Sequence, residues 1–212
     1  QSPQLVEAPN NIGAALVNMG RHDEAIPWFE AALRINPKYV VAVHNIGNAH
    51  RVRGRHADAV ARYQQALQLD PGYAPALGAM ATSLTAMGRL PEALALCRDA
   101  VAKQPANADL WFQLGMLCAK HADSRPEGIA AYQKVVALAP NPRAHNNLGT
   151  LFLESAQREA AVAQFQAALR MDPNYTRAHN NLGNAYSQLG ETARSEQHYQ
   201  AAIKINPGYV SP

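Results

Sequence analysis

Four asparagines occupy matching places along the chain, and their side chains could hold a polypeptide backbone. Each lies two residues before a glycine, at Asn11, Asn45, Asn147 and Asn181. An asparagine amide carries both a donor and an acceptor, so it can match the N–H and the C=O of a peptide group. Because one hydrogen bond contributes only about 1 kcal/mol net, several must act together. The pattern predicts a ladder of amides that binds an extended main chain without reading its side chains.

Four more polar residues lie one helical turn from these asparagines. Two asparagines follow by three residues and two arginines precede by four, at Asn48, Asn184, Arg143 and Arg177. The arginines would favour acidic or phosphorylated segments. A second interpretation stays open: the asparagines could bond a neighbouring helix and support stacking, and the arginines could form a solvated charged surface.

The elements that position these residues follow from a repeat of about 34 residues. Six prolines mark it, at Pro37, Pro71, Pro105, Pro140, Pro173 and Pro207. Such a period indicates stacked supersecondary units that share one core. Apolar residues follow helical spacing and no segment alternates with period two, so each repeat should hold two helices. First helices are predicted near 9–19, 41–53, 75–87, 108–121, 143–155 and 176–189, and second helices near 23–35, 57–69, 91–103, 126–138, 158–171 and 192–205.

Glycines and rings recur in the same register. One glycine recurs at Gly13, Gly47, Gly115, Gly149 and Gly183, a second at Gly20, Gly54, Gly88 and Gly190, and a ring at Phe29, Tyr63, Tyr132, Phe165 and Tyr199. The second glycine fits the left-handed position just past a helix end. Ala81 and Ala156 replace glycines, which is harmless if the backbone stays helical at these positions.

With the alanines between them, these residues resemble the tetratricopeptide repeat family from about Val6 to Pro207. The resemblance implies an all-α fold, a right-handed α-solenoid of six helix-turn-helix repeats. It also implies that first helices line the concave groove, which would place the asparagines there.

The array is expected over residues 9–207, with repeats at about 6–39, 40–73, 74–107, 108–141, 142–175 and 176–209. Residues 1–8 are expected to be a tail or the remnant of a preceding element, and 208–212 the start of a further repeat. The fourth repeat carries one extra residue within Lys120–Arg125, so a local change of twist is expected there. No polar cap is evident at the C-terminal end, which predicts a longer parent protein or a contact with another chain.

The segment HNNLGNAYSQLG at residues 179–190 resembles the repeats of O-linked N-acetylglucosamine transferase. That resemblance implies that Asn11, Asn45, Asn147 and Asn181 hold substrate peptides. Three functions therefore stay open. They are a non-catalytic scaffold that binds a protein or peptide in the groove, the substrate-recruiting arm of such a glycosyltransferase, and a structural scaffold that self-associates end to end.

Composition and motifs argue against several other functional classes of protein. The net charge is +3 and aromatic residues make up 7%, less than a nucleic-acid-binding surface needs. No apolar run is long enough to span a membrane. Four of the eight histidines lie at equivalent repeat positions, His22 with His56 and His145 with His179. No pair forms a zinc-protease motif, so no metal, cofactor or catalytic residue is expected. Cys97 and Cys118 fall at apolar positions and are predicted to be buried, reduced thiols, which suggests a cytoplasmic protein.

Overall fold

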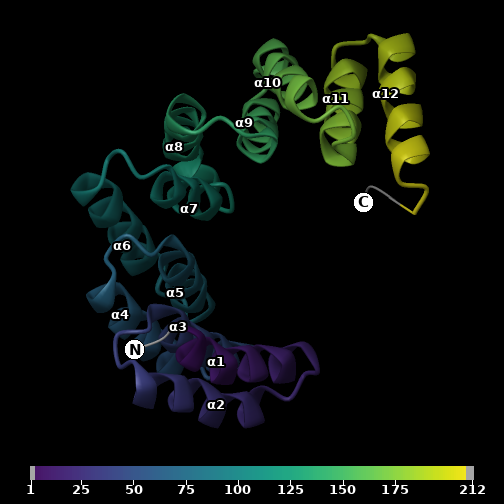
Figure 1. Ribbon diagram of the computed structural model, residues 1–212. Helices are drawn as coiled ribbons and strands as arrows, with labels where there is room; N and C mark the ends of the chain where they lie inside the picture. The colour runs from purple at the N-terminus through teal and green to yellow at the C-terminus, as the bar shows by residue number, and fades with distance from the viewer. Residues whose placement is uncertain (1–2, 209–212) are drawn as a thin grey trace. The chain divides into compact units, whose positions relative to one another are not determined.

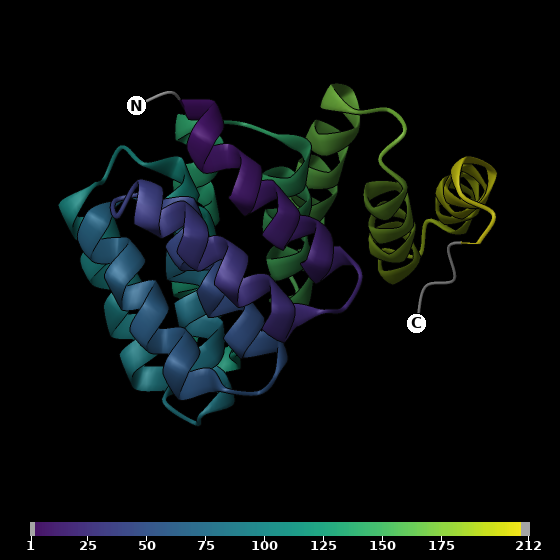
Figure 2. The same cartoon turned by 60° about the horizontal axis from the view of Figure 1, so that its bottom comes forward.

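The computed structural model describes residues 3–208, and within them helices alternate with short turns (Figures 1 and 2). The helices are α1 (Pro3–Asn18), α2 (His22–Ile35), α3 (Val40–Val52), α4 (His56–Leu69), α5 (Ala74–Ala86), α6 (Leu90–Lys103), α7 (Ala108–Cys118), the 3₁₀ turn η1 (Ala122–Ser124), α8 (Arg125–Leu138), α9 (Pro142–Glu154), α10 (Arg158–Met171), α11 (Thr176–Gln188) and α12 (Thr192–Ile205). No strand occurs in this range. The all-α prediction and the two helices per repeat are confirmed.

The chain divides into two compact units, Gln1–Gln113 and Leu114–Pro212, with the division inside α7. In the first unit, α1 packs against α2, α2 against α3, and so on to α6. In the second unit the same neighbour-to-neighbour packing runs from α8 to α12. Each unit is therefore a stretch of α-solenoid, in which every helix buries its apolar face against the helices beside it in the sequence.

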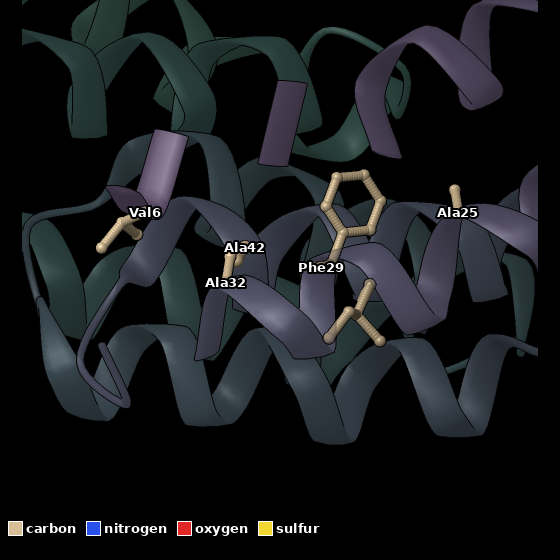
Figure 3. Packing of buried hydrophobic residues seen from close by; sticks show 6 residues of the cluster. Val6, Ala25, Phe29, Ala32 and Ala42 are labelled. Atoms are coloured by element: carbon tan, nitrogen blue, oxygen red, sulfur yellow. The ribbon is translucent and has the colours of Figure 1, made fainter. Parts of the chain in front are cut away.

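In five of the six repeats the core is a ring seated on a glycine, whereas the third repeat has Cys97 and Ala81 at these positions. A Cβ atom added to Gly13 would lie 2.6 Å from the Phe29 ring, and one added to Gly149 would lie 2.6 Å from the Phe165 ring. Figure 3 shows Phe29 with its neighbours Val6, Ala25, Ala32 and Ala42. Only glycine lets the two helices of a repeat approach this closely, as the recurring pair predicts.

The turn glycines adopt the left-handed conformation that their position predicts. Their φ angles are 77° at Gly20, 73° at Gly54, 76° at Gly88 and 78° at Gly190. Ala81 lies within helix α5, so its backbone stays helical. The condition is not met at Ala156, because its φ is +58° and its backbone is therefore not right-handed helical. The turn geometry imposes this angle whatever the residue, so alanine here carries conformational strain.

The first helix begins earlier than predicted. The expected start at residue 9 is wrong, because α1 begins at Pro3 and Pro9 lies inside it. Residues 3–8, expected to belong to a tail, are helical. Val6 is buried against Ala25, Phe29 and Ala32 of α2, and this packing stabilises a turn that local propensity leaves open.

The extra residue of the fourth repeat is absorbed by η1, which separates α7 from α8. The change of twist expected there stays a prediction, as do the repeat boundaries. Most of the further repeat expected at 208–212 lies outside the described residues.

Candidate functional site

A pocket of about 500 Å³ lies on the first helices of the second unit. Its wall comes from the end of α7, from α9 and from α11, with one residue from α8. The lining residues are Met116, Ala119, Lys120, Tyr132, Arg143, Asn146, Asn147, Thr150, Leu151, Glu154, Arg177, Asn180 and Asn181. Four of the eight residues predicted from the sequence thus meet in one hollow: Arg143, Asn147, Arg177 and Asn181.

The helical period of α9 places its share of the wall. Arg143, Asn147, Thr150 and Glu154 are three or four residues apart, so they follow one face of the helix. The phase of the helix is set at its start, where the Asn141 Oδ1 atom accepts a hydrogen bond of 2.9 Å from the Ala144 N–H. Pro142 follows at the first helical position, where a missing N–H costs nothing.

The ladder asparagines donate to the protein in two ways. Asn181 Nδ2 donates to Asn146 Oδ1 at 3.0 Å and, more weakly, to Thr150 Oγ1 at 3.4 Å. Asn147 Nδ2 instead donates to the Tyr132 hydroxyl at 3.0 Å. Each of these bonds ties a first helix to the preceding repeat, so the amide donors support stacking.

The side-chain carbonyls of the same residues are not used in this way. Within residues 3–208, the Oδ1 atoms of Asn147 and Asn181 accept no hydrogen bond from the protein. Both side chains are half-buried and line the pocket. Two acceptors on neighbouring helices are therefore available to backbone N–H groups of a bound chain.

The charges in the pocket are mainly positive. Lys120, Arg143 and Arg177 are exposed, and the Arg143 guanidinium also lies 3.8 Å from the Met116 sulfur. The Glu154 carboxylate is the acidic group of the wall, and it pairs with the Arg125 Nε atom at 3.2 Å. With that carboxylate already paired, the pocket attracts negative charge.

Tyr132 contributes a neutral hydroxyl. Burial raises the pKa of the Tyr132 hydroxyl to about 12, although the hydrogen bond from Asn147 acts in the opposite direction. The phenol therefore keeps its proton at neutral pH and adds no negative charge to the wall.

The other predicted residues lie outside this pocket. Asn11, Asn45 and Asn48 belong to the first unit, where Asn45 Nδ2 donates to Asn10 Oδ1 at 3.1 Å. Asn48 Oδ1 accepts a 2.8 Å hydrogen bond from the Tyr63 hydroxyl. Asn184 Oδ1 accepts one from the Tyr199 hydroxyl in the same way. Asn48 and Asn184 thus each provide a hydrogen-bond acceptor for the hydroxyl of the tyrosine ring in the same repeat.

Sequence reasoning missed several residues of the wall. Lys120 lies in the turn with the extra residue, so the repeat register did not place it. Asn146 and Asn180 precede the ladder positions by one residue, and the doubled asparagines at 146–147 and 180–181 were the available signal.

Residues 3–208 contain no group of three or more His, Cys, Asp or Glu side chains that could hold a metal ion. None of the helices described has the length and apolar character needed to cross a bilayer. Cys97 and Cys118 are buried, as predicted.

Comparisons with family models agree with the fold. Three tetratricopeptide repeat models match residues 4–72, 52–120 and 146–210. Together these matches take in most of the chain. No curated protein sequence matches the chain.

Several solved structures share the fold. TTC0263, a thermophilic tetratricopeptide repeat protein of Thermus thermophilus, is 24% identical over 86% of this chain and 99% of its own, with a TM-score of 0.66. YrrB, described as a tetratricopeptide repeat protein with an unusual peptide-binding site, is 24% identical over 85% and 93%, with a TM-score of 0.60. PilF of Pseudomonas aeruginosa is 16% identical over 97% and 94%, with a TM-score of 0.69. At these identities the likeness concerns architecture.

Proposed function

The chain belongs to the tetratricopeptide repeat family, and we propose that it is a non-catalytic protein-interaction scaffold that binds an extended acidic segment. The pocket on α7, α9 and α11 is the proposed site. The observation that carries this proposal is the meeting of Arg143, Asn147, Arg177 and Asn181 in one hollow of about 500 Å³.

The spacing of the wall suits an extended chain. Neighbouring helices pack roughly 8–10 Å apart, and an extended chain rises about 3.3 Å per residue. Asn147 and Asn181 would therefore meet every third residue or so, with each Oδ1 accepting a backbone N–H. Arg143, Arg177 and Lys120 would bind carboxylates on the side chains between these contacts.

We propose that Asn11, Asn45 and Asn48 of the first unit, and Asn184 of the second, would make the same kind of contact. The peptide-binding site named for YrrB supports this class of function for the fold. A substrate-recruiting arm of a glycosyltransferase would use the same amides, and both this alternative and a cytoplasmic location stay predictions.

Binding of a defined acidic peptide tests the proposal. The probe is a fluorescein-labelled, end-capped nonapeptide with Asp at every third position among Ser and Gly, and its partner carries Lys at those positions. Fluorescence anisotropy at low salt should show binding of the Asp peptide only. Arg143→Ala with Arg177→Ala should raise its Kd about tenfold, because two partly exposed charge contacts contribute somewhat under 1 kcal/mol each.

The matched control removes the same charge elsewhere. Arg34 and Arg170 are exposed and lie outside the lining of the pocket, so Arg34→Ala with Arg170→Ala should leave the Kd nearly unchanged. Equal losses in the two double variants would mean that only net charge attracts the peptide. Equal binding of the Lys peptide would remove the acidic segment from the proposal.

A further inference from the structure

One residue on the wall of the pocket departs from the repeat pattern. The position after the helix-packing glycine, or after Ala81 where alanine replaces it, is half-buried or exposed in all six repeats, so it lies outside the core. Five repeats have a small or polar residue there, and the fourth has methionine. The residues are Ala14, Asn48, Thr82, Met116, Thr150 and Asn184. Because the other repeats fold without a long apolar side chain at this position, packing of the repeat does not require Met116.

Hydrogen bonding within a repeat also favours another residue at position 116. In the second and sixth repeats, an asparagine at the same position accepts a hydrogen bond from the tyrosine hydroxyl of its own repeat. The fourth repeat has a tyrosine as well, Tyr132, but Met116 offers no amide to it. Asn147 of the next repeat donates to the Tyr132 hydroxyl instead, at 3.0 Å. A residue that departs from the folding rule of its own repeat in this way points to a second task.

The surroundings of Met116 combine apolar groups with a positive charge. Met116 and Ala119 are both half-buried and both line the pocket. Leu151, which is 1% exposed, belongs to the same wall. The Arg143 guanidinium lies 3.8 Å from the Met116 sulfur. A carboxylate held by this arginine would therefore lie directly beside an apolar surface.

The geometry of an extended chain converts this neighbourhood into a spacing. Side chains alternate between the two faces of such a chain, so residues i and i+2 point the same way and lie about 6.6 Å apart. When an acidic residue of the bound segment meets Arg143, the residue two positions away faces the same wall, at Met116. An apolar side chain gains there from its removal from water, and the flexible thioether adapts to its shape.

We infer that the bound segment carries an aliphatic side chain two residues from the acidic residue held by Arg143, and that this side chain packs on Met116 and Ala119. The partner is thus an acidic segment with aliphatic residues at a fixed spacing, and Met116 determines this part of its specificity. The inference rests on the proposed function, to which it adds a second recognition element.

Three labelled nonapeptides, compared by fluorescence anisotropy at low salt, test the spacing. The reference peptide has Asp at positions 2, 5 and 8 among Ser and Gly. The second peptide adds Leu at positions 4 and 6, each two residues inside an outer Asp, so one Leu meets Met116 whichever way the chain runs. The third has the same composition with Leu at positions 1 and 9. The second peptide should bind about tenfold more tightly than the other two, because part of one leucine side chain becomes buried.

Two variants of residue 116 assign the gain to this side chain. Met116→Thr introduces the residue that both adjacent repeats have at this position, at Thr82 and Thr150, and the second peptide should then lose its advantage over the reference. Met116→Leu keeps an apolar side chain of similar volume and should keep the advantage. Met171→Thr is the matched control and should also keep it, since Met171 is 46% exposed on α10 and lies outside the lining of the pocket. Circular dichroism verifies that each variant folds.

The failure of this inference can be distinguished from the failure of the proposed function. If the three peptides bind equally well, the apolar contact is absent while the acidic-segment scaffold stands. Equal tightening by both Leu peptides would show a nonspecific apolar attraction, and an advantage that survives Met116→Thr would place the contact elsewhere. Absence of binding by all three peptides would remove the proposed function and this inference together.

Discussion

Replacing Ala156 by glycine should stabilise the protein, although the same change in a helix destabilises it. Ala156 has a φ of +58° in the turn between α9 and α10. The matching turn between α11 and α12 has Gly190 at a φ of +78°, where an added Cβ would meet nothing within 4 Å. Ala156 is itself exposed, so relief of backbone strain is the main expected effect of the change.

The magnitude follows from two opposing terms. A left-handed conformation costs a residue with a Cβ roughly 1–2 kcal/mol. Replacing alanine by glycine removes this strain but also lowers stability by about 0.4–1 kcal/mol, because the unfolded chain gains entropy. The net gain for Ala156→Gly is about 1 kcal/mol, and Gly190→Ala should lose a similar amount.

Urea unfolding followed by circular dichroism measures both changes. Ala163→Gly is the matched control, since Ala163 is exposed within α10 and its replacement should cost up to about 1 kcal/mol. The reasoning fails if Ala156→Gly destabilises as much as Ala163→Gly, because the turn at residue 156 would then be right-handed in solution.

Two further predictions concern polar groups of the first unit that are at least partly buried. Burial, and secondly the charge of Arg51, lowers the pKa of His44 to about 4, so its contribution to stability is complete above the unfolded pKa near 6.5 and is lost as the pH falls toward 4. The full pKa shift would correspond to about 3 kcal/mol of unfolding free energy, which the partial exposure of His44 reduces to about 1–2 kcal/mol. In urea unfolding at pH 7.5 and at pH 5, the His44→Gln variant should lose less unfolding free energy between the two pH values than the wild type. Equal losses would contradict the burial of His44 as the cause. The second prediction is that Tyr63→Phe and Asn48→Ala are coupled by about 1 kcal/mol, because the Tyr63 hydroxyl donates to Asn48 at 2.8 Å. A double-mutant cycle measures the coupling, and strict additivity would show that the bond adds nothing to stability.

Most of the fold could be predicted because each repeat position has one physical task. A glycine under a ring and a glycine past a helix end place the helices to within a few residues. Ala156 could not be predicted in this way, because its φ is imposed by the turn and not by its side chain. The start of α1 was missed for a related reason: the burial of Val6 depends on α2, and no local signal reports it.

The candidate site was predictable in part. The stripe of Arg143 and Asn147 follows from helical spacing, and the repeat period brings Arg177 and Asn181 beside it. The placement of Lys120 depends on how the extra residue folds into η1, which the register does not specify. The hydrogen-bond partner of each ladder asparagine depends on the preceding repeat. Asn146 accepts the bond from Asn181. The matching residue one repeat earlier is Phe112, whose side chain has no acceptor, and Asn147 donates to the Tyr132 hydroxyl instead.

The asparagine ladder can support stacking and also bind a peptide, because each side-chain amide has an NH₂ donor and a separate carbonyl acceptor. In Asn181 the donor faces the preceding repeat while the carbonyl has no protein partner among the described residues. A repeat that needs only stacking and a repeat that also binds a peptide can therefore carry the same asparagine, and the asparagine pattern cannot separate them. Arg143 and Arg177 can, because both are exposed on the wall of the pocket and contribute little to folding at such positions. Their presence at one repeat position in two neighbouring first helices, α9 and α11, is the feature that stacking does not require, and it makes them the residues on which the proposed function rests.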